Sequence, residues 1–385
     1  MKILFVTGSL VHGGAERHTI TLANRLAERG HECHAVYVKD DPSQLPRLKL
    51  GEGRVRCLYA KRYLDADAFL TLRSEMVRRK PTVIVAANPY ALMYATLGKR
   101  LAGSAAPLAV TYHSTKLLNR KEFAQMLAYR PFFWTADRAV FVCEAQRKHW
   151  RARYVFGRRS EVIYNGVDTG HWQPWSGAER ARLRGALGLA EADYAIGMSA
   201  VLRPEKNHLQ LVEAIAMLRR RGTPARALMI GDGPMRPAIE ERARRLGVAS
   251  YVSITGFQQE VRPFVAACDV VALTSFTEAF SLAAIEAMAL GRPVVHSEVG
   301  GAAEMIRPGR NGYLYPVGDT MALVERLGAL ADRAACERMG ARAREAVEAQ
   351  FSEDAMVARY EKLLLEMESQ RTPHAPKVRR PAGAH

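Results

Sequence analysis

The strongest constraint on the fold is the alternation of short apolar runs with amphipathic helical patterns, which the chain completes twice. In the first half, strands are predicted at residues 3–7, 35–38, 55–59, 83–87, 108–112 and 139–143. In the second half, they are predicted at residues 195–201, 227–230, 252–255, 270–273 and 294–297. Helical patterns between them cover residues 15–29, 66–79, 90–101, 120–134, 209–221, 236–246 and 321–330. Such alternation produces parallel sheets with helices on both faces, so the predicted fold class is α/β with two Rossmann-like, doubly wound domains.

The break between the two halves is predicted at residues 164–175. Asn165-Gly166 is a turn signal, and Gly170 and Pro174 interrupt regular structure. A chain of 385 residues is also too long for one ordinary hydrophobic core. We therefore predict a first domain over residues 1–170, a second over 171–352, a closing helix over 353–370 that packs back on the first domain, and a basic disordered tail over 371–385. Ligands of such folds bind in the cleft at the carboxyl ends of the strands.

The net charge of +17 is concentrated in the first half of the chain. Residues 1–170 hold 28 Lys and Arg against 14 Asp and Glu, whereas residues 171–370 hold 24 against 25. A basic half suggests an anionic partner such as nucleic acid, a membrane surface or a phosphorylated lipid. The basic and aromatic segment 116–134 fits either an interfacial membrane helix or a core helix with a basic outer face, and the charge of the whole half favours the membrane.

The compartment is predicted to be the cytoplasm, at the inner face of the plasma membrane. The five cysteines are odd in number, widely spread and without a Cys-x-x-Cys pair, which fits a reducing compartment and disfavours a structural metal site. The first apolar run is too short for a signal peptide. The longest apolar segment, 82–97, contains Asn88 and Pro89, so no transmembrane helix is expected.

The stretch 276–295 is predicted to form a loop, a helix, a turn and a strand. Ser281 is a suitable N-cap, and Gly291 ends the helix. Glu278 then lies in the loop before the helix, and Glu286 lies inside it. Because a helix N-terminus after a buried strand attracts anions, acids at this place need hydroxyl groups or cations to bind. Sugars and ribose provide such hydroxyl groups.

Three other loops follow predicted strands and carry polar or glycine residues. Gly13 and Gly14 follow the first strand, and they fit either a phosphate-binding loop or a plain turn. Their spacing is not that of a nicotinamide-binding Rossmann motif. His113 follows strand 108–112, where a polar side chain faces the cleft, although a lone histidine is often structural. Arg203 and Lys206 follow the first strand of the second half, and a guanidinium beside an ammonium group suits a diphosphate.

In this order, the motifs resemble the signatures of family-4 retaining glycosyltransferases, whose fold is called GT-B. The resemblance also includes Gly231-Asp232-Gly233-Pro234, Gly256-Phe257 and the segments 299–304 and 311–314, so that it spans the chain from Gly13 to Asp319. It implies a metal-independent, hexosyl-type transfer from a nucleotide-diphosphate sugar, with a UDP-sugar favoured over a GDP-sugar. The implied acceptor is a lipid-linked or glycan hydroxyl, as in bacterial lipopolysaccharide or other surface-polysaccharide biosynthesis.

The resemblance also implies roles for individual residues. Arg203 and Lys206 would neutralise the leaving diphosphate, Glu286 would hold the ribose diol, Glu278 would orient the donor sugar, and His113 would contact that sugar from the first domain. The implied catalytic set is His113, Arg203, Lys206 and Glu278; the donor-binding set is Gly13, Gly14, Arg203, Lys206, Gly231, Phe257, Glu278, Ala279, Phe280, Ser281 and Glu286; and the acceptor-binding set is Glu16, Lys116 and Arg120.

Parts of the sequence are also compatible with a metal site and with two other functions. Asp65-Ala66-Asp67 has the Asp-x-Asp form of a divalent-metal site, but it precedes a helical pattern, so N-terminal capping is predicted instead and no metal or other cofactor is expected. A nucleotide-sugar 2-epimerase of the same fold is the first alternative function. A non-enzymatic, basic nucleic-acid-binding protein is the second, and it is disfavoured because no nucleic-acid reader motif is present.

Overall fold

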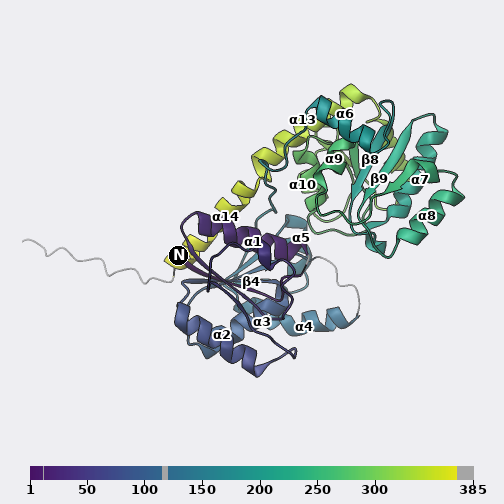
Figure 1. Ribbon diagram of the computed structural model, residues 1–385. Coiled ribbons are helices and arrows are strands. Elements are labelled where there is room, and N and C mark those ends of the chain that lie inside the picture. Colours follow the sequence, from purple (N-terminus) through teal and green to yellow (C-terminus); the bar gives the residue numbers. More distant parts are fainter. Residues whose placement is uncertain (12, 115–119, 371–385) are drawn as a thin grey trace, which may run out of the picture.

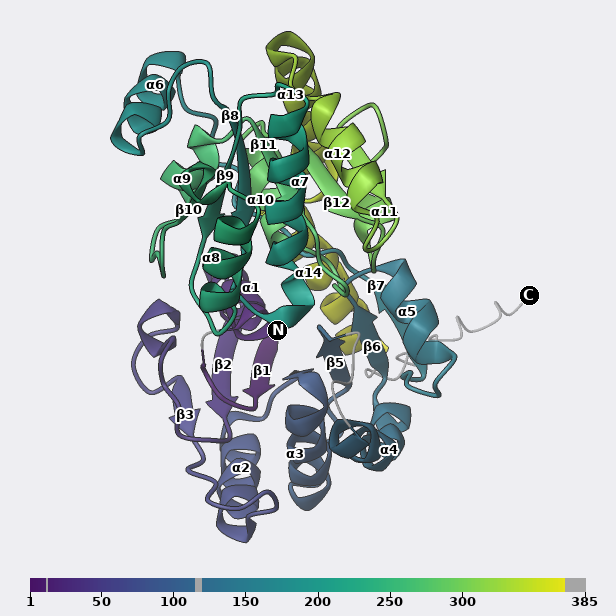
Figure 2. The same cartoon turned by 90° about the vertical axis from the view of Figure 1, so that its right-hand side faces the viewer.

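The computed structural model describes residues 1–11, 13–114 and 120–370, with only the main chain of residues 120 and 121. Two α/β domains lie one beyond the other, and the C-terminal helix runs back along the first of them (Figure 1). Figure 2 shows the same two layered bodies from the side. This arrangement confirms the predicted fold class.

The first domain is built on a seven-stranded parallel sheet with the strand order β3-β2-β1-β4-β5-β6-β7. Its strands are β1 (Lys2–Thr7), β2 (Glu32–Tyr37), β3 (Val55–Cys57), β4 (Val83–Ala87), β5 (Leu108–Tyr112), β6 (Arg138–Phe141) and β7 (Arg159–Val162). Its helices are α1 (Gly14–Glu28), η1 (Leu45–Arg47), α2 (Ala66–Arg79), α3 (Asn88–Leu101), α4 (Arg120–Thr135) and α5 (Glu144–Arg151).

The second domain holds a six-stranded parallel sheet with the strand order β10-β9-β8-β11-β12-β13. Its strands are β8 (Tyr194–Ser199), β9 (Ala225–Ile230), β10 (Val252–Ile254), β11 (Val270–Leu273), β12 (Val294–Ser297) and β13 (Gly312–Tyr315). The helices that follow β7 are α6 (Gly177–Ala186), η2 (Pro204–Lys206), α7 (His208–Arg220), α8 (Arg236–Arg245), η3 (Ala249–Tyr251), α9 (Arg262–Ala267), α10 (Leu282–Ala289), α11 (Ala302–Met305), α12 (Thr320–Gly328), α13 (Arg333–Gln350) and α14 (Glu353–Ser369).

Both faces of the first sheet are covered, which explains why its strands are continuous apolar runs. On β1, Leu4 and Val6 face a core formed with α2, α3 and α4, whereas Ile3 and Phe5 face a second core formed with α1 and α14. Because successive side chains of a strand point to opposite faces, a strand buried on both faces needs an apolar residue at every position.

Every strand and helix predicted above is present, with ends shifted by a few residues, but several elements were missed. Strand β7 has the sequence Arg-Ser-Glu-Val at the edge of its sheet, and β13 begins at Gly312 directly after Asn311, a pair that indicates a turn. Helices α5, α6 and α13 were also missed, and α13 has few apolar residues on its long exposed face. These elements form because neighbouring elements pack against them.

Helix α14 joins the two domains. Its apolar side, with Met356, Val357, Tyr360 and Leu364, is buried against the first domain. Residues just before it pair with the chain that connects the domains: the Val167 amide donates to the Phe351 carbonyl at 2.9 Å, and the Glu353 amide donates to the Val167 carbonyl at 2.9 Å. The closing helix therefore packs on the first domain as predicted, and the division into ranges 1–170, 171–352 and 353–370 stays a prediction.

Three smaller predictions concern the ends of the chain and its helices. Asp65 caps α2, because its side chain accepts from the Ala68 amide at 3.1 Å, which is the predicted capping role. The predicted tail, 371–385, lies outside the described residues. Within the described ranges, none of the helices combines the length and the apolar character that crossing a membrane requires.

Candidate active site

The carboxyl ends of the two sheets border a pocket of about 470 Å³ that residues of both domains line. From the first domain come Gly14 at the start of α1 and His113 after β5, and from the second come Phe280 and Leu282 at the start of α10. Parallel strands place all their following loops at one edge of a sheet, so loops distant in sequence meet here.

Glu278 and Lys206 meet at this edge of the second domain. They form an ion pair through Glu278 Oε1 and Lys206 Nζ, and the Ser275 hydroxyl donates to the same carboxylate oxygen at 3.0 Å. The Thr274 hydroxyl donates to the Lys206 carbonyl at 2.9 Å, which ties the end of β11 to η2. Both side chains of the ion pair are partly exposed, at 26% for Lys206 and 16% for Glu278, so a ligand can reach them.

The loop that carries Glu278 is held by a close backbone contact. Gly300 has a φ of +52°, and a Cβ atom there would lie 2.1 Å from the Glu278 carbonyl oxygen, so only glycine fits. Ser281 then caps α10, because its hydroxyl accepts from the Ala284 amide at 3.3 Å. This confirms the predicted N-cap and fixes Glu278 just before the helix.

Glu286 lies inside α10 and is paired across the domain boundary. Its Oε1 is 2.9 Å from Nη1 of Arg17 on α1, and its side chain is only 10% exposed. Burial raises the pKa of Glu286, and the guanidinium of Arg17 partly opposes that rise. A buried carboxylate costs solvation free energy unless it is paired, so the site supplies a partner for it even without a ligand. Arg17 was not among the predicted site residues, although it directly follows the Gly13–Glu16 motif.

His113 is held in a cluster of buried rings. Its ring centroid lies 4.5 Å from that of His18 on α1, and His18 lies 5.3 Å from the ring of Tyr360 on α14. Burial lowers the pKa of His113 to about 4 and holds the pKa of His18 well below its ordinary value, with the charge of His113 adding to the effect on His18. His113 is therefore neutral at physiological pH, which suits a hydrogen bond to a sugar hydroxyl.

The glycine loop before α1 makes a close turn at the pocket. Gly13 is the N-cap of α1 in an extended conformation, and Glu16 folds back so far that a Cβ atom on Gly13 would lie 2.3 Å from its Oε2. Glu16 also lines the pocket, and burial raises the pKa of its carboxyl group. Gly14 faces Leu282 of the other domain, with a Cβ position 3.8 Å from Leu282 Cδ1.

Arg203, Gly231 and Phe257 occupy neighbouring loops of the second domain. The Leu202 amide donates to the Asp232 carbonyl at 3.0 Å, and Gly231 pairs with Gly256 in an isolated bridge. Gly231 has a φ of +142°, and a Cβ atom there would lie 2.2 Å from the Ala200 carbonyl oxygen, so this turn requires glycine. Phe257 is 79% exposed and Arg203 is exposed beside η2.

Ala279 and Phe280 contribute to the domain contact, and Phe280 also lines the pocket. The Phe280 ring stacks on Tyr164 with centroids 5.4 Å apart, and the Cys143 thiol donates to the Ala279 carbonyl at 3.1 Å. A related contact was missed: the carboxylate of Glu304 accepts from two amides at the start of α5, each at 2.8 Å. A helix N-terminus in one domain is thus bound by an acid of the other, a pairing that no local pattern indicates.

Not all predicted residues can be placed. Lys116 lies outside the described residues, and only the main chain of Arg120, at the start of α4, is described. Where side chains are described, no three His, Cys, Asp or Glu residues gather in a group that could hold a metal ion. The acceptor role of Lys116 and Arg120 stays a prediction.

Comparison with known proteins gives matches over both halves of the chain. Residues 12–171 match the family profile described as Glycosyltransferase Family 4, and residues 193–333 match the one described as Glycosyl transferases group 1. Among individual proteins, N-acetyl-alpha-D-glucosaminyl L-malate synthase of Bacillus anthracis is 26% identical over 358 residues, covering 91% of this chain and 93% of that protein. The lipopolysaccharide core biosynthesis glycosyltransferase LpsE of Rhizobium meliloti is 29% identical over 359 residues, covering 91% of this chain and 96% of that protein.

A solved structure supports the fold. HepE of Anabaena in complex with UDP is similar with a TM-score of 0.84 and 23% sequence identity, covering 95% of this chain and 100% of that chain. At this identity the likeness concerns the fold, and it agrees with the two parallel sheets described above.

Proposed function

This chain belongs to the family-4 glycosyltransferases of the GT-B fold, and on that premise we propose that it transfers a sugar, with retention of configuration and without a metal, from a nucleotide-diphosphate sugar to an acceptor hydroxyl. The observation that carries the proposal is the ion pair of Lys206 with Glu278, in the loop that leads to Phe280, which lines the same pocket as His113. A UDP-sugar is the proposed donor, supported by the UDP bound to HepE.

In the proposed reaction, the bond between the anomeric carbon and the diphosphate oxygen breaks, and its electron pair leaves with the diphosphate. The acceptor oxygen forms the new bond to the anomeric carbon, and its proton passes to an oxygen of the leaving diphosphate. The largest charge develops on the leaving diphosphate, so Arg203 and Lys206 would stabilise the transition state from fixed positions. Lys206 would then exchange part of its contact with Glu278 for the phosphate.

The two carboxylates have different proposed tasks. Glu278 lies in the loop before α10 and would bind hydroxyl groups of the donor sugar, and neutral His113 would contact the same sugar from the first domain. Glu286 lies further along α10 and would accept hydrogen bonds from the ribose hydroxyls in place of, or together with, the contact to Arg17. Phe257, which is exposed in the ligand-free protein, would contact the nucleotide base.

The acceptor is proposed to be lipid-linked or a glycan, with lipopolysaccharide or another surface polysaccharide as the product. The similarity to LpsE supports this pathway. The exposed side of α4 supports the delivery of such an acceptor from an anionic membrane: Phe123, Leu127 and Trp134 are 51%, 42% and 47% exposed and lie on one side of the helix. We propose that the enzyme acts at the cytoplasmic face of the membrane through this side and the basic charge of its domain.

The test is an assay of purified enzyme with UDP-glucose, UDP-N-acetylglucosamine, UDP-galactose and GDP-mannose, with release of nucleotide measured with and without lipid-linked glycan acceptors. Acceptor-dependent release and a product with the anomeric configuration of the donor sugar are expected. An epimerase, which the transferase relatives do not favour, would give nucleotide release or sugar conversion without any acceptor. If EDTA abolished acceptor-dependent transfer, metal independence would be wrong.

A further inference from the structure

A second pocket, of about 460 Å³, lies at the end of the second domain opposite the candidate active site. It is bordered by α6, by α13 and by the turn between α10 and β12. Of its lining residues, Asp269 directly precedes β11 and Arg292 lies two residues before β12, whereas Glu278 follows the carboxyl end of β11. Four guanidinium groups line this pocket: those of Arg180, Arg292, Arg333 and Arg344.

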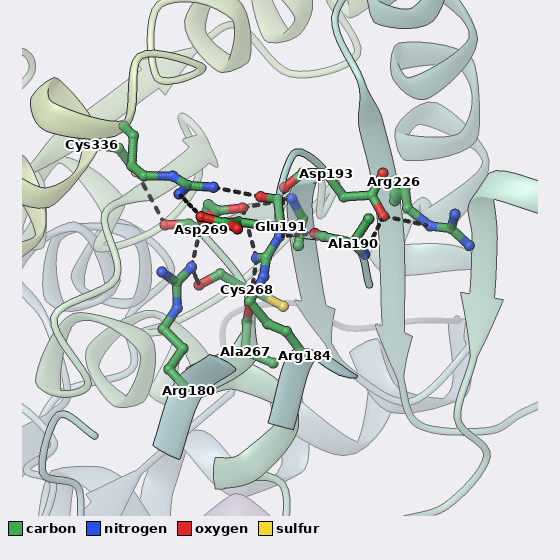
Figure 3. Close-up of polar contacts among 12 residues, drawn as sticks. Arg180, Arg184, Ala190, Glu191, Asp193, Arg226, Ala267, Cys268, Asp269 and Cys336 are labelled. Atoms are coloured by element: carbon green, nitrogen blue, oxygen red, sulfur yellow. Dashed lines mark hydrogen bonds and ion pairs between the residues drawn. The ribbon is translucent and has the colours of Figure 1, made fainter. Parts of the chain in front are cut away.

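One carboxylate serves several donors in the inner part of the pocket. Asp269 Oδ1 pairs with Arg180 Nη2 at 2.5 Å, and its Oδ2 pairs with Arg184 Nη1 at 3.1 Å (Figure 3). The same Oδ2 also accepts from the Ala195 amide at 2.7 Å. Asp269 is thus fully used by two arginines and one amide, and it supplies one negative charge against two positive charges.

Arg292 adds a further positive charge, and among the described side chains no carboxylate forms an ion pair with it. Its Nε donates to the Leu290 carbonyl at 3.3 Å and its Nη1 to the Cys268 carbonyl at 3.4 Å. Arg180 Nη2 donates to the same Cys268 carbonyl at 3.2 Å, so two guanidinium groups approach one oxygen. A carbonyl is neutral and cannot cancel their charges. Burial, and next the charge of Arg180, lower the pKa of Arg292, in keeping with that crowding.

The arginines at the rim are more nearly compensated. Arg344 pairs with Glu348 at 2.6 Å, and Arg333, which is 53% exposed, lies 3.9 Å from Glu191. The remaining acid of the lining, Glu337, is exposed on α13. The inner group of Arg180, Arg184, Arg292 and Asp269 therefore keeps an excess of two positive charges beside an open space.

We propose that this pocket binds a small phosphate-type anion, at a site separate from the donor site in the cleft. Guanidinium groups bind phosphate oxygens in pairs of hydrogen bonds, and they do so better when partly removed from water. The bound anion would supply negative charge that Asp269 alone does not provide for Arg180, Arg184 and Arg292, and the exposed Arg333 would reach it as well.

Isothermal titration of inorganic phosphate, against chloride of equal ionic strength, tests the proposal. The titration uses the full chain carrying Arg203→Ala and Lys206→Ala, which removes the proposed diphosphate contacts in the cleft. Saturable binding at one site is expected to persist in this background. Arg292→Gln added to it should weaken binding about tenfold or more, the effect of losing one charge-assisted contact. Arg310→Gln, which removes an exposed cation of the same domain outside the pocket, should leave binding unchanged.

Arg333→Gln provides a second variant that does not depend on the buried network, since its side chain is half exposed. This substitution should weaken phosphate binding several-fold while leaving the melting temperature in chloride unchanged. It tests the proposed site even if the Arg292→Gln variant does not fold. Three results would overturn the proposal: no saturable binding in the cleft-disabled background, binding that Arg292→Gln and Arg333→Gln leave intact, or equal weakening by Arg310→Gln, which would indicate general screening. Because the background lacks Arg203 and Lys206, failure of this site and failure of the proposed donor site are distinguishable.

Discussion

Replacing Glu286 by Gln should weaken nucleotide binding without abolishing the fold. In the ligand-free protein, Glu286 is buried and forms an ion pair with Arg17, whose side chain is 40% exposed. Glutamine keeps the shape of the side chain and removes a carboxylate whose pKa burial already raises. Arg17 can then be solvated by water, so the melting temperature should change little.

The expected loss of affinity follows from the hydrogen bonds that Glu286 would make. A hydrogen bond to a charged acceptor contributes roughly 1.5–3 kcal/mol, which corresponds to about a 10- to 150-fold rise in the Kd for UDP. The lower part of this range is expected here, because the ribose must compete with Arg17 for the carboxylate. The affinity for the UDP-sugar should fall by a similar factor, since nucleotide and donor share the ribose.

The matched control is Glu278→Gln in the neighbouring loop. Glu278 is paired with Lys206 in the loop before α10, so its removal should leave the affinity for free UDP nearly unchanged and lower the turnover of the intact donor. Calorimetric titration of UDP and turnover of each variant check both statements. If Glu278→Gln lost UDP affinity while Glu286→Gln kept it, the two assignments would be reversed; if neither variant changed binding or rate, this loop and helix would not form the donor site.

Three further predictions follow from the same structure. Arg203→Ala should lower turnover roughly a hundredfold with an unchanged melting temperature, because the side chain is exposed; wild-type turnover in a steady-state assay would contradict its role at the diphosphate. Trp134→Ser on the exposed side of α4 should reduce sedimentation of the protein with anionic vesicles, and raised salt should reduce it further. Equal sedimentation with neutral and anionic vesicles would argue against a contribution of charge to membrane binding. His18 and His113 are held neutral by burial, with pKa values below the ordinary 6.5. Below about pH 6.5 the unfolded chain therefore binds more protons than the folded chain, and the stability of the fold should fall as the pH drops toward 5. Melting curves that stay constant over this interval would refute the burial of the two rings.

Much of this fold follows from local sequence patterns. Apolar runs at residues 3–7 and 270–273 are strands because both faces of each sheet are covered, so every position must be apolar. Ser281 and Asp65 cap helices as predicted, since a cap depends on residues only a few positions away. The order of the glycine, basic and acidic motifs also identified the family, because each motif lies in a loop at the carboxyl end of a strand.

The tertiary structure alone decided which distant residues meet. Arg17 reaches Glu286 across the domain boundary, and His18 contacts His113 because α1 begins, and β5 ends, at the same pocket. Strand β13 forms although its start resembles a turn, because β12 offers it a partner. Contacts of this kind depend on how two domains and a returning helix pack, and their residues carry no pattern in the linear sequence that would distinguish them from ordinary helix or loop positions.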